Sequence, residues 1–179
     1  FDRESIQNSQ EDLDLVNSLL ALIFKLKEGQ PFAFAHLDDP AATFGPIETD
    51  AEEFEDQRQQ IDIMLAGSPR SERNLAAALA ETYNFLGGQQ AGPESVIYFI
   101  TASKPGLDPP AIPDRLRSIV SLLGDASWSV NTVTLPGTSS EVVQVLSRLS
   151  DETGGESFSI GIPAGLREFA DRILRTEAK

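Results

Sequence analysis

The feature that most constrains the fold of this chain is a short apolar run, Val96 to Ile100, which lies between segments whose apolar residues have helical spacing. A run of this length without polar alternation is typical of a strand covered on both of its faces. In the same part of the chain the spacing predicts helices at 71–86, 113–123, 139–150 and 164–175, and strands at 128–135 and 157–160. Strands that alternate with helices form a parallel sheet with right-handed crossovers.

The first third of the chain predicts a different arrangement. Four apolar residues with helical spacing, Leu13, Val16, Leu20 and Ile23, predict a helix over roughly 10–28 that ends at Gly29. Strand-like segments at 31–37 and 41–47 are joined by turn residues at 38–40, so we expect an antiparallel pair, followed by a helix near 51–66. The chain is therefore predicted to be α/β, with a doubly wound, mostly parallel open sheet, one antiparallel edge strand and helices on both faces.

Composition excludes several functional classes. The chain has 28 acidic and 14 basic residues, and this net charge of −14 opposes binding to nucleic acid or to an anionic membrane. It has no cysteine, which excludes disulfides, thiolate metal sites and cysteine nucleophiles. No apolar run is long enough to span a bilayer, so we expect no direct membrane insertion. The densest acidic stretch, Glu48 to Asp56, is interpreted as a solvated helix start in preference to a binding patch.

Common catalytic signatures are missing from the sequence. There is no glycine-rich dinucleotide or phosphate loop, no nucleophile elbow and no H-E-x-x-H zinc motif. His36 is the single histidine, and a structural or surface role is favoured for it, as core or edge packing is for Trp128. A pair of carboxylates could perform acid–base catalysis, but no spacing in the sequence selects such a pair.

Several segments, taken in order, resemble the von Willebrand factor type A family over nearly the whole chain. They are Phe1-Asp2-Arg3-Glu4-Ser5-Ile6, Arg73-Asn74-Leu75 with Ala78-Leu79, Ile97 to Ser103, and Leu149 to Gly155. The most specific part is Glu152 to Phe158, which is similar to the family's helix end, glycine turn and last strand. The resemblance implies an open sheet with one antiparallel edge strand and ligands at the carboxyl ends of the strands.

The resemblance also implies a place where many family members bind a metal ion. There, a D-x-S-x-S segment, a threonine and an aspartate supply oxygen ligands that suit Mg²⁺. Asp2 matches the first aspartate, whereas four other positions depart from the pattern: Glu4 and Ile6 replace the two serines, Arg73 the threonine and Ala102 the aspartate, with Ser103 after it. We therefore expect a degenerate adhesion site without a metal cofactor. The donors left for Mg²⁺ are Asp2, Glu4 and Ser103.

Arg73 introduces a permanent positive charge at this position. Because a guanidinium pairs well with carboxylates, one hypothesis is that Arg73 pairs with Asp2 or Glu4 and takes the place of the metal. The alternative, weighed equally, is that Arg73 is a solvated residue in the first turn of a helix.

The start of the chain is also explained by the resemblance. The family's first strand is central and ends just before the D-x-S-x-S segment, so Phe1 and Asp2 correspond to its last residues. We expect one domain over 1–179 whose first strand is truncated upstream of Phe1, with either upstream residues or another segment in the gap. An open position in the middle of a sheet would leave buried main-chain groups without partners.

These observations favour a non-enzymatic protein-interaction domain that binds a protein partner through the strand-end loops or through the acidic stretch Glu48 to Asp56. One alternative is a metal-dependent adhesion domain that uses Asp2, Glu4 and Ser103. Another is a doubly wound enzyme that uses paired carboxylates. The resemblance alone suggests an extracellular or membrane-tethered location within a larger protein, and the sequence does not identify the partner.

Overall fold

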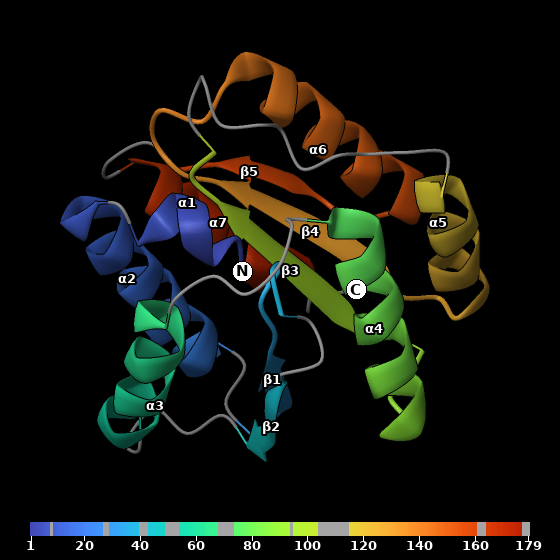
Figure 1. Ribbon diagram of the computed structural model, residues 1–179, viewed down its shortest axis with the longest axis horizontal. Helices are drawn as coiled ribbons and strands as arrows, with labels where there is room; N and C mark the ends of the chain where they lie inside the picture. Colours follow the sequence, from blue (N-terminus) through green and yellow to red (C-terminus); the bar gives the residue numbers. More distant parts are fainter. Residues whose placement is uncertain are drawn as a thin grey trace.

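The computed structural model describes residues 1–7, 9–26, 29–39, 43–48, 54–67, 74–93, 95–103, 115–160 and 164–176 (Figure 1). The elements in order are α1 (Arg3–Ile6), α2 (Gln10–Leu26), β1 (Pro31–Phe34), β2 (Phe44–Glu48), α3 (Phe54–Ala66), α4 (Leu75–Gly88), β3 (Val96–Thr101), α5 (Arg115–Asp125), β4 (Ser129–Thr134), α6 (Ser140–Thr153), β5 (Ser157–Ser159) and α7 (Ala164–Thr176). All elements except the short α1 were predicted from sequence. Among the described helices, none has the length and apolar character needed to cross a bilayer.

The strands form two sheets. In the order β3-β4-β5, three strands are parallel, with Val96 opposite Ser129 and Thr132 opposite Ser157. β1 and β2 form a separate antiparallel pair, with Phe32 opposite Ile47. The predicted α/β class, parallel core and antiparallel pair are confirmed. The structure differs from the prediction in that no ladder joins the antiparallel pair to the other described strands.

The first two residues lie between these sheets. The Phe1 amino nitrogen donates to the Ala35 carbonyl at 2.8 Å, and the Leu37 amide donates to the Phe1 carbonyl at 2.8 Å. On the other side, the Asp2 amide donates to the Ile100 carbonyl at 2.9 Å. Phe1 and Asp2 therefore connect the chain that follows β1 with the end of β3.

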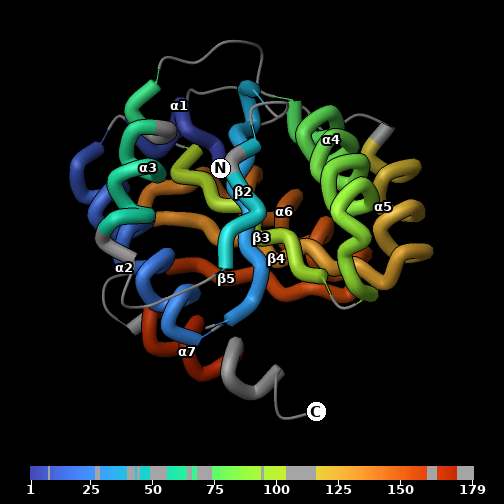
Figure 2. Tube along the Cα trace, turned by 90° about the horizontal axis from the view of Figure 1, so that it is seen from below, coloured from blue at the N-terminus to red at the C-terminus, as the bar shows by residue number. Residues whose placement is uncertain are grey.

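Two hydrophobic cores cover the two faces of the parallel sheet. On one face, α2 and α7 pack on Ile100, Val133 and Phe158. On the other face, α4, α5 and α6 pack on Phe99 and Val130. Successive strand residues point to opposite faces, which is why neighbours such as Phe99 and Ile100 belong to different cores. Figure 2 shows β1 and β2 between the α2–α3 side and the α4–α5 side.

The first half of β3 is less buried than the sequence predicted. Phe99 and Ile100 are at most 5% exposed, but Val96 is 39% exposed and Ile97 and Tyr98 are half-buried. The apolar run predicted burial of the whole strand on both faces, and that prediction is wrong for its first three residues. The reason is that this part of β3 borders a groove on the side away from β4.

The turn between α6 and β5 depends on two adjacent glycines. Gly154 has a φ of +72°, in the left-handed region that favours glycine after a helix. Gly155 lies against β4 so closely that a Cβ would be 2.2 Å from the Val130 carbonyl oxygen. This structure matches the helix end, glycine turn and strand predicted for Glu152 to Phe158.

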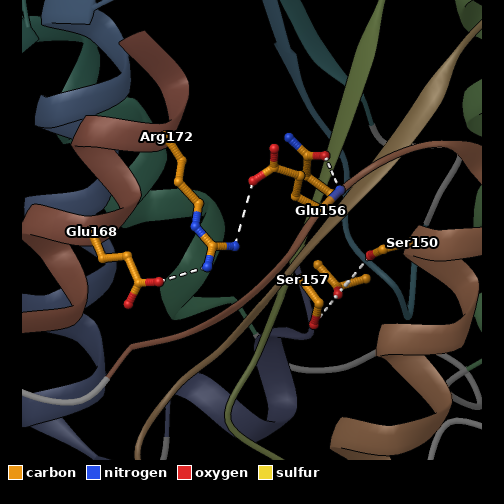
Figure 3. A network of polar contacts seen from close by, with 7 residues as sticks. Ser150, Glu156, Ser157, Glu168 and Arg172 are labelled. Carbon is orange, nitrogen blue, oxygen red and sulfur yellow. Dashed lines mark hydrogen bonds and ion pairs between the residues drawn. The ribbon is translucent and has the colours of Figure 1, made fainter. Parts of the chain in front are cut away.

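Polar contacts join α7 to the strand that follows this turn. Arg172 donates to Glu168 at 2.6 Å and lies 3.6 Å from a Glu156 carboxylate oxygen, as Figure 3 shows. Its guanidinium carbon is also 5.6 Å from the centre of the Phe158 ring. Because these groups are partly exposed, we assign them an orienting role and only a small contribution to stability.

The glycine turn gives a test of the fold. Gly155→Ala should lower the free energy of unfolding by roughly 1–3 kcal/mol or more, because the added carbon meets main chain that cannot move aside. Gly154→Ala should lower it by about 1 kcal/mol through the left-handed φ alone. Urea unfolding measures both values.

The matched control is Gly124→Ala in α5, where nothing lies within 4 Å of the added carbon. It should leave the stability unchanged or raise it by up to about 1 kcal/mol. Equal effects at Gly154 and Gly155 would contradict the close approach to β4.

Candidate functional site

The candidate site is a group of buried polar side chains at the carboxyl end of β3. Its members are Asp2, Ser5, Thr101 and Ser103, called here the β3-end cluster, and each is at most 2% exposed. Thr101 is the last residue of β3, while Asp2 and Ser5 come from the N-terminal segment and α1. In an α/β sheet the carboxyl ends of parallel strands are the usual place for ligands.

Thr101 connects the members of the cluster. Its hydroxyl donates to an Asp2 carboxylate oxygen at 2.6 Å and accepts from the Ser103 amide at 3.1 Å. The Ser5 hydroxyl lies 3.2 Å away. Charge-assisted bonds of this kind are strong, and they direct the Asp2 carboxylate toward the end of β3.

Ser5 continues the hydrogen-bond pattern where the N-terminal segment turns into α1. A parallel ladder that contains the Asp2–Ile100 bond would next join the Ala102 amide to the Asp2 carbonyl. Instead, the Ala102 amide donates to the Ser5 hydroxyl at 2.9 Å, and that hydroxyl donates to the Asp2 carbonyl at 2.9 Å. One side chain therefore takes the place of a main-chain bond, which allows the chain to leave the sheet.

A buried ion pair lies beside the cluster. The Arg3 guanidinium donates to the Asp38 carboxylate, and the two side chains are 6% and 1% exposed. Arg3 begins α1, and Asp38 belongs to the segment that follows β1. Because the pair is removed from water, deletion of either partner would leave a buried charge, which is far more costly than loss of a surface ion pair.

His36 is buried close to these charges. It is 4% exposed, and burial lowers its pKa to about 4, with smaller contributions from the positive Phe1 amino group and Arg3. The imidazole is therefore neutral at pH 7, as a histidine held for packing would be. The predicted structural role agrees with this burial.

The structure brings some of the predicted site residues together. Asp2, Ala102 and Ser103 all lie at the end of β3, and Glu4 is half-buried on the adjacent α1. The side chain of Ile6 packs in the hydrophobic core with α2. Arg73 lies outside the described residues, as do residues 49–53 of the acidic stretch, so the Arg73 ion-pair hypothesis stays a prediction.

Sequence reasoning missed four contributors, Arg3, Ser5, Asp38 and Thr101. The signal for Thr101 was present, since a hydroxyl at the end of a buried apolar strand needs a partner. Ser5 was missed because it lies one position from where the D-x-S-x-S pattern places a serine. Nothing in the sequence indicated that Arg3 and Asp38 would meet.

The Ser5 and Thr101 hydroxyls and one Asp2 carboxylate oxygen bond to one another and to main chain. A divalent cation such as Mg²⁺ requires about six oxygen ligands in near-octahedral geometry. Within the ranges that the structure describes, no group of three or more His, Asp or Glu side chains is arranged to hold a metal. The described residues thus fit an internal hydrogen-bonded cluster better than a metal site.

A double-mutant cycle tests the buried ion pair. Arg3→Met and Asp38→Leu should each lower the free energy of unfolding by roughly 3–5 kcal/mol, because each leaves one charge buried without its partner. The double variant should lose much less than the sum of the two. Additive losses in urea unfolding would contradict the pairing, and Arg148→Met at an exposed α6 position is the control.

The pH dependence of stability tests the environment of His36. Its pKa is lower in the folded state, about 4, than the ordinary value of 6.5, so the unfolded chain binds the proton first. Stability from this group should be complete above pH 6.5 and should be lost as the pH falls toward 4. His36→Gln should flatten this part of the profile, and the single histidine gives one imidazole NMR signal to titrate. A midpoint near 6.5 in the folded protein would refute the assignment.

Comparison with known proteins identifies the fold. No protein-family model and no curated protein matches the sequence. The structure is similar to a von Willebrand factor type A protein from Catenulispora acidiphila, with a TM-score of 0.70 and 12% identity over 96% of this chain and 40% of that one. It is also similar to the human COPII-coat protein Sec24c, with a TM-score of 0.61 and 12% identity over 89% of this chain and 30% of that one. This chain therefore spans less than half of either protein, and its fold is von Willebrand factor type A-like.

Proposed function

We propose that this chain is a non-enzymatic protein-interaction domain that binds its partner without a metal ion, at the carboxyl ends of the parallel strands. The observation that carries the proposal is the β3-end cluster. Its carboxylate and hydroxyl groups bond to one another in a fold that generally suggests protein interaction. A metal-dependent domain would present such carboxylate and hydroxyl groups to a metal ion and its ligand. In this chain the Asp2 carboxylate and the Ser5 hydroxyl bond to other residues of the same domain.

The proposed binding surface is the rim of the cluster, formed by the loop after β4 and by Glu4 of α1. The Ser139 amide donates to the Ser103 carbonyl at 2.9 Å, which fixes the loop after β4 against the end of β3. In this loop Pro136 is exposed and Thr138 half-buried, and Glu4 of α1 is half-buried beside Asp2. A surface of exposed loop atoms on a rigid sheet is suited to recognition.

Charge indicates the kind of partner. With a net charge of −14, the domain repels acidic surfaces and attracts basic ones over distances beyond direct contact. We therefore propose a protein partner with a basic surface, whose association rate falls as salt is added.

The proposal is tested by selecting binders from a displayed library of protein fragments with the immobilised domain. Glu4→Arg should weaken the selected binding tenfold or more, through loss of attraction at the rim. Glu81→Arg on α4 makes the same charge change at an exposed position away from the rim and should change binding less than twofold. Melting temperatures establish that both variants fold.

Metal dependence is measured in the same assay and by melting temperature. EDTA and millimolar Mg²⁺ should leave affinity and melting temperature unchanged. Binding that requires Mg²⁺, or a saturable rise in melting temperature that Asp2→Ala abolishes, would instead support the adhesion alternative. Binding that ignores Glu4→Arg would place the interaction surface elsewhere.

A further inference from the structure

The loop after β4 contains a tight turn of four residues, Leu135 to Thr138. Its ends are joined by a hydrogen bond from the Thr138 amide to the Leu135 carbonyl at 3.2 Å. Pro136 occupies the second position, where the proline ring already has the φ that the turn requires. Gly137 occupies the third position with a φ of +83°. These are the features of a type II turn, so the Pro-Gly sequence itself favours the conformation that the structure shows.

Further contacts hold this turn at both ends. The Thr138 hydroxyl donates to the Leu135 carbonyl at 2.8 Å, which is a second bond across the turn. The Leu135 side chain is buried, and its amide donates to the Thr101 carbonyl at 2.9 Å. After the turn, the Ser139 amide donates to the Ser103 carbonyl, and the Ser139 side chain caps α6. The turn therefore has little conformational freedom to lose when a partner binds.

The exposed part of the turn is an apolar ring. Pro136 and Gly137 are exposed, whereas Leu135 is buried and Thr138 is half-buried. Because glycine has no side chain, the pyrrolidine ring of Pro136 is the side chain that the turn presents to solvent. A rigidly held apolar ring gives a partner contact area at a small cost in conformational entropy.

The turn is connected to the β3-end cluster through Thr101. The carbonyl of Thr101 accepts from the amide at the start of the turn, while its hydroxyl bonds the Asp2 carboxylate. Carboxylates from two helices belong to the same end of the sheet. Glu141 is exposed in the first turn of α6, and Glu4 is half-buried on α1. This end of the domain therefore combines one rigid apolar ring with negative charge.

We propose that Pro136 is the apolar anchor of the rim, and that the partner receives it between tyrosine or tryptophan rings with lysine or arginine beside them. This inference rests on the proposed protein-interaction function and names the chemistry of the partner. The second position of a type II turn has φ and ψ of roughly −60° and +120°, close to those of polyproline II. Prolines in that conformation are recognised by aromatic-lined grooves. Basic groups beside the rings would pair with the carboxylates Glu4 and Glu141.

A turn that served only to connect β4 with α6 makes a different prediction. Proline at the second position restricts the unfolded chain, so its replacement in a purely connecting turn would lower the stability and leave binding unchanged. In the proposed role, replacement of Pro136 also removes the ring that the partner contacts. Affinity therefore separates the two roles, whereas the melting temperature alone does not.

Two short peptides serve as the probes. One alternates lysine with tryptophan and the other alternates lysine with leucine, so that both have the same length and charge. Each is titrated into the domain while the amide signals are followed by NMR. The tryptophan peptide should shift the Gly137 and Thr138 amide signals saturably and bind on the order of fivefold more tightly than the leucine peptide. The leucine peptide measures the attraction that arises from charge and aliphatic contact.

Three variants assign the binding to the turn. Pro136→Ala should weaken binding of the tryptophan peptide on the order of fivefold and remove the difference between the two peptides. Pro93→Ala, at an exposed proline before β3 and so at the other end of that strand, is the matched control and should change affinity less than twofold. Thr138→Val removes the side-chain bond across the turn and keeps the ring, so it should weaken binding and speed hydrogen exchange at the Thr138 amide. Melting temperatures establish that the variants fold.

The outcomes separate this inference from the function on which it rests. Binding that Glu4→Arg weakens but Pro136→Ala leaves unchanged would overturn the anchor and keep the rim as the binding surface. Binding that ignores both substitutions would overturn the rim as well. Equal affinity for the two peptides, or the absence of a saturable shift at Gly137 and Thr138 with the tryptophan peptide, would also overturn the anchor.

Discussion

The hydrogen bonds of Phe1 and Asp2 are the constraint on which the rest of the structure depends. In the described part of the chain they join the antiparallel pair to the parallel sheet through main-chain groups. A two-stranded pair is marginally stable alone. Here it also gains from aromatic packing, since the Phe1 and Phe34 rings stack at 5.8 Å and Phe24 of α2 lies 5.5 Å from Phe32. The position of β1 and β2 therefore depends on the main-chain bonds of Phe1 and Asp2 and on the hydrophobic core that contains Phe34.

The polar site is a consequence of the same connection. Asp2 can accept from Thr101 because its own amide is fixed to β3, and the turn into α1 then carries Arg3 to Asp38 and Ser5 to the next main-chain amide. These buried charges add little net stability compared with an apolar core of equal volume. Their effect is to fix the position of α1 against the end of β3, because each bond requires one arrangement of the two.

The elements of the fold could be predicted from sequence because their signals are local. Helical spacing located α2, and Gly154 and Gly155 mark the turn before β5. The site was less predictable, because Arg3 and Asp38 are 35 positions apart and Ser5 and Thr101 are 96 apart. Such pairs are set by the topology and not by any neighbouring residue. The burial of β3 was overestimated because its apolar run predicted cover along the whole strand, whereas residues 96–100 border the groove.

The groove between β1 and β3 and the β3-end cluster meet at neighbouring residues, because Phe1 lines the groove and Asp2 belongs to the cluster. Whatever fixes Phe1 in place also reduces the freedom that Asp2, Ser5 and Arg3 must lose to form the cluster. A partner that recognises the rim only when the cluster is formed would then bind more tightly, by the factor by which the formed state gains population.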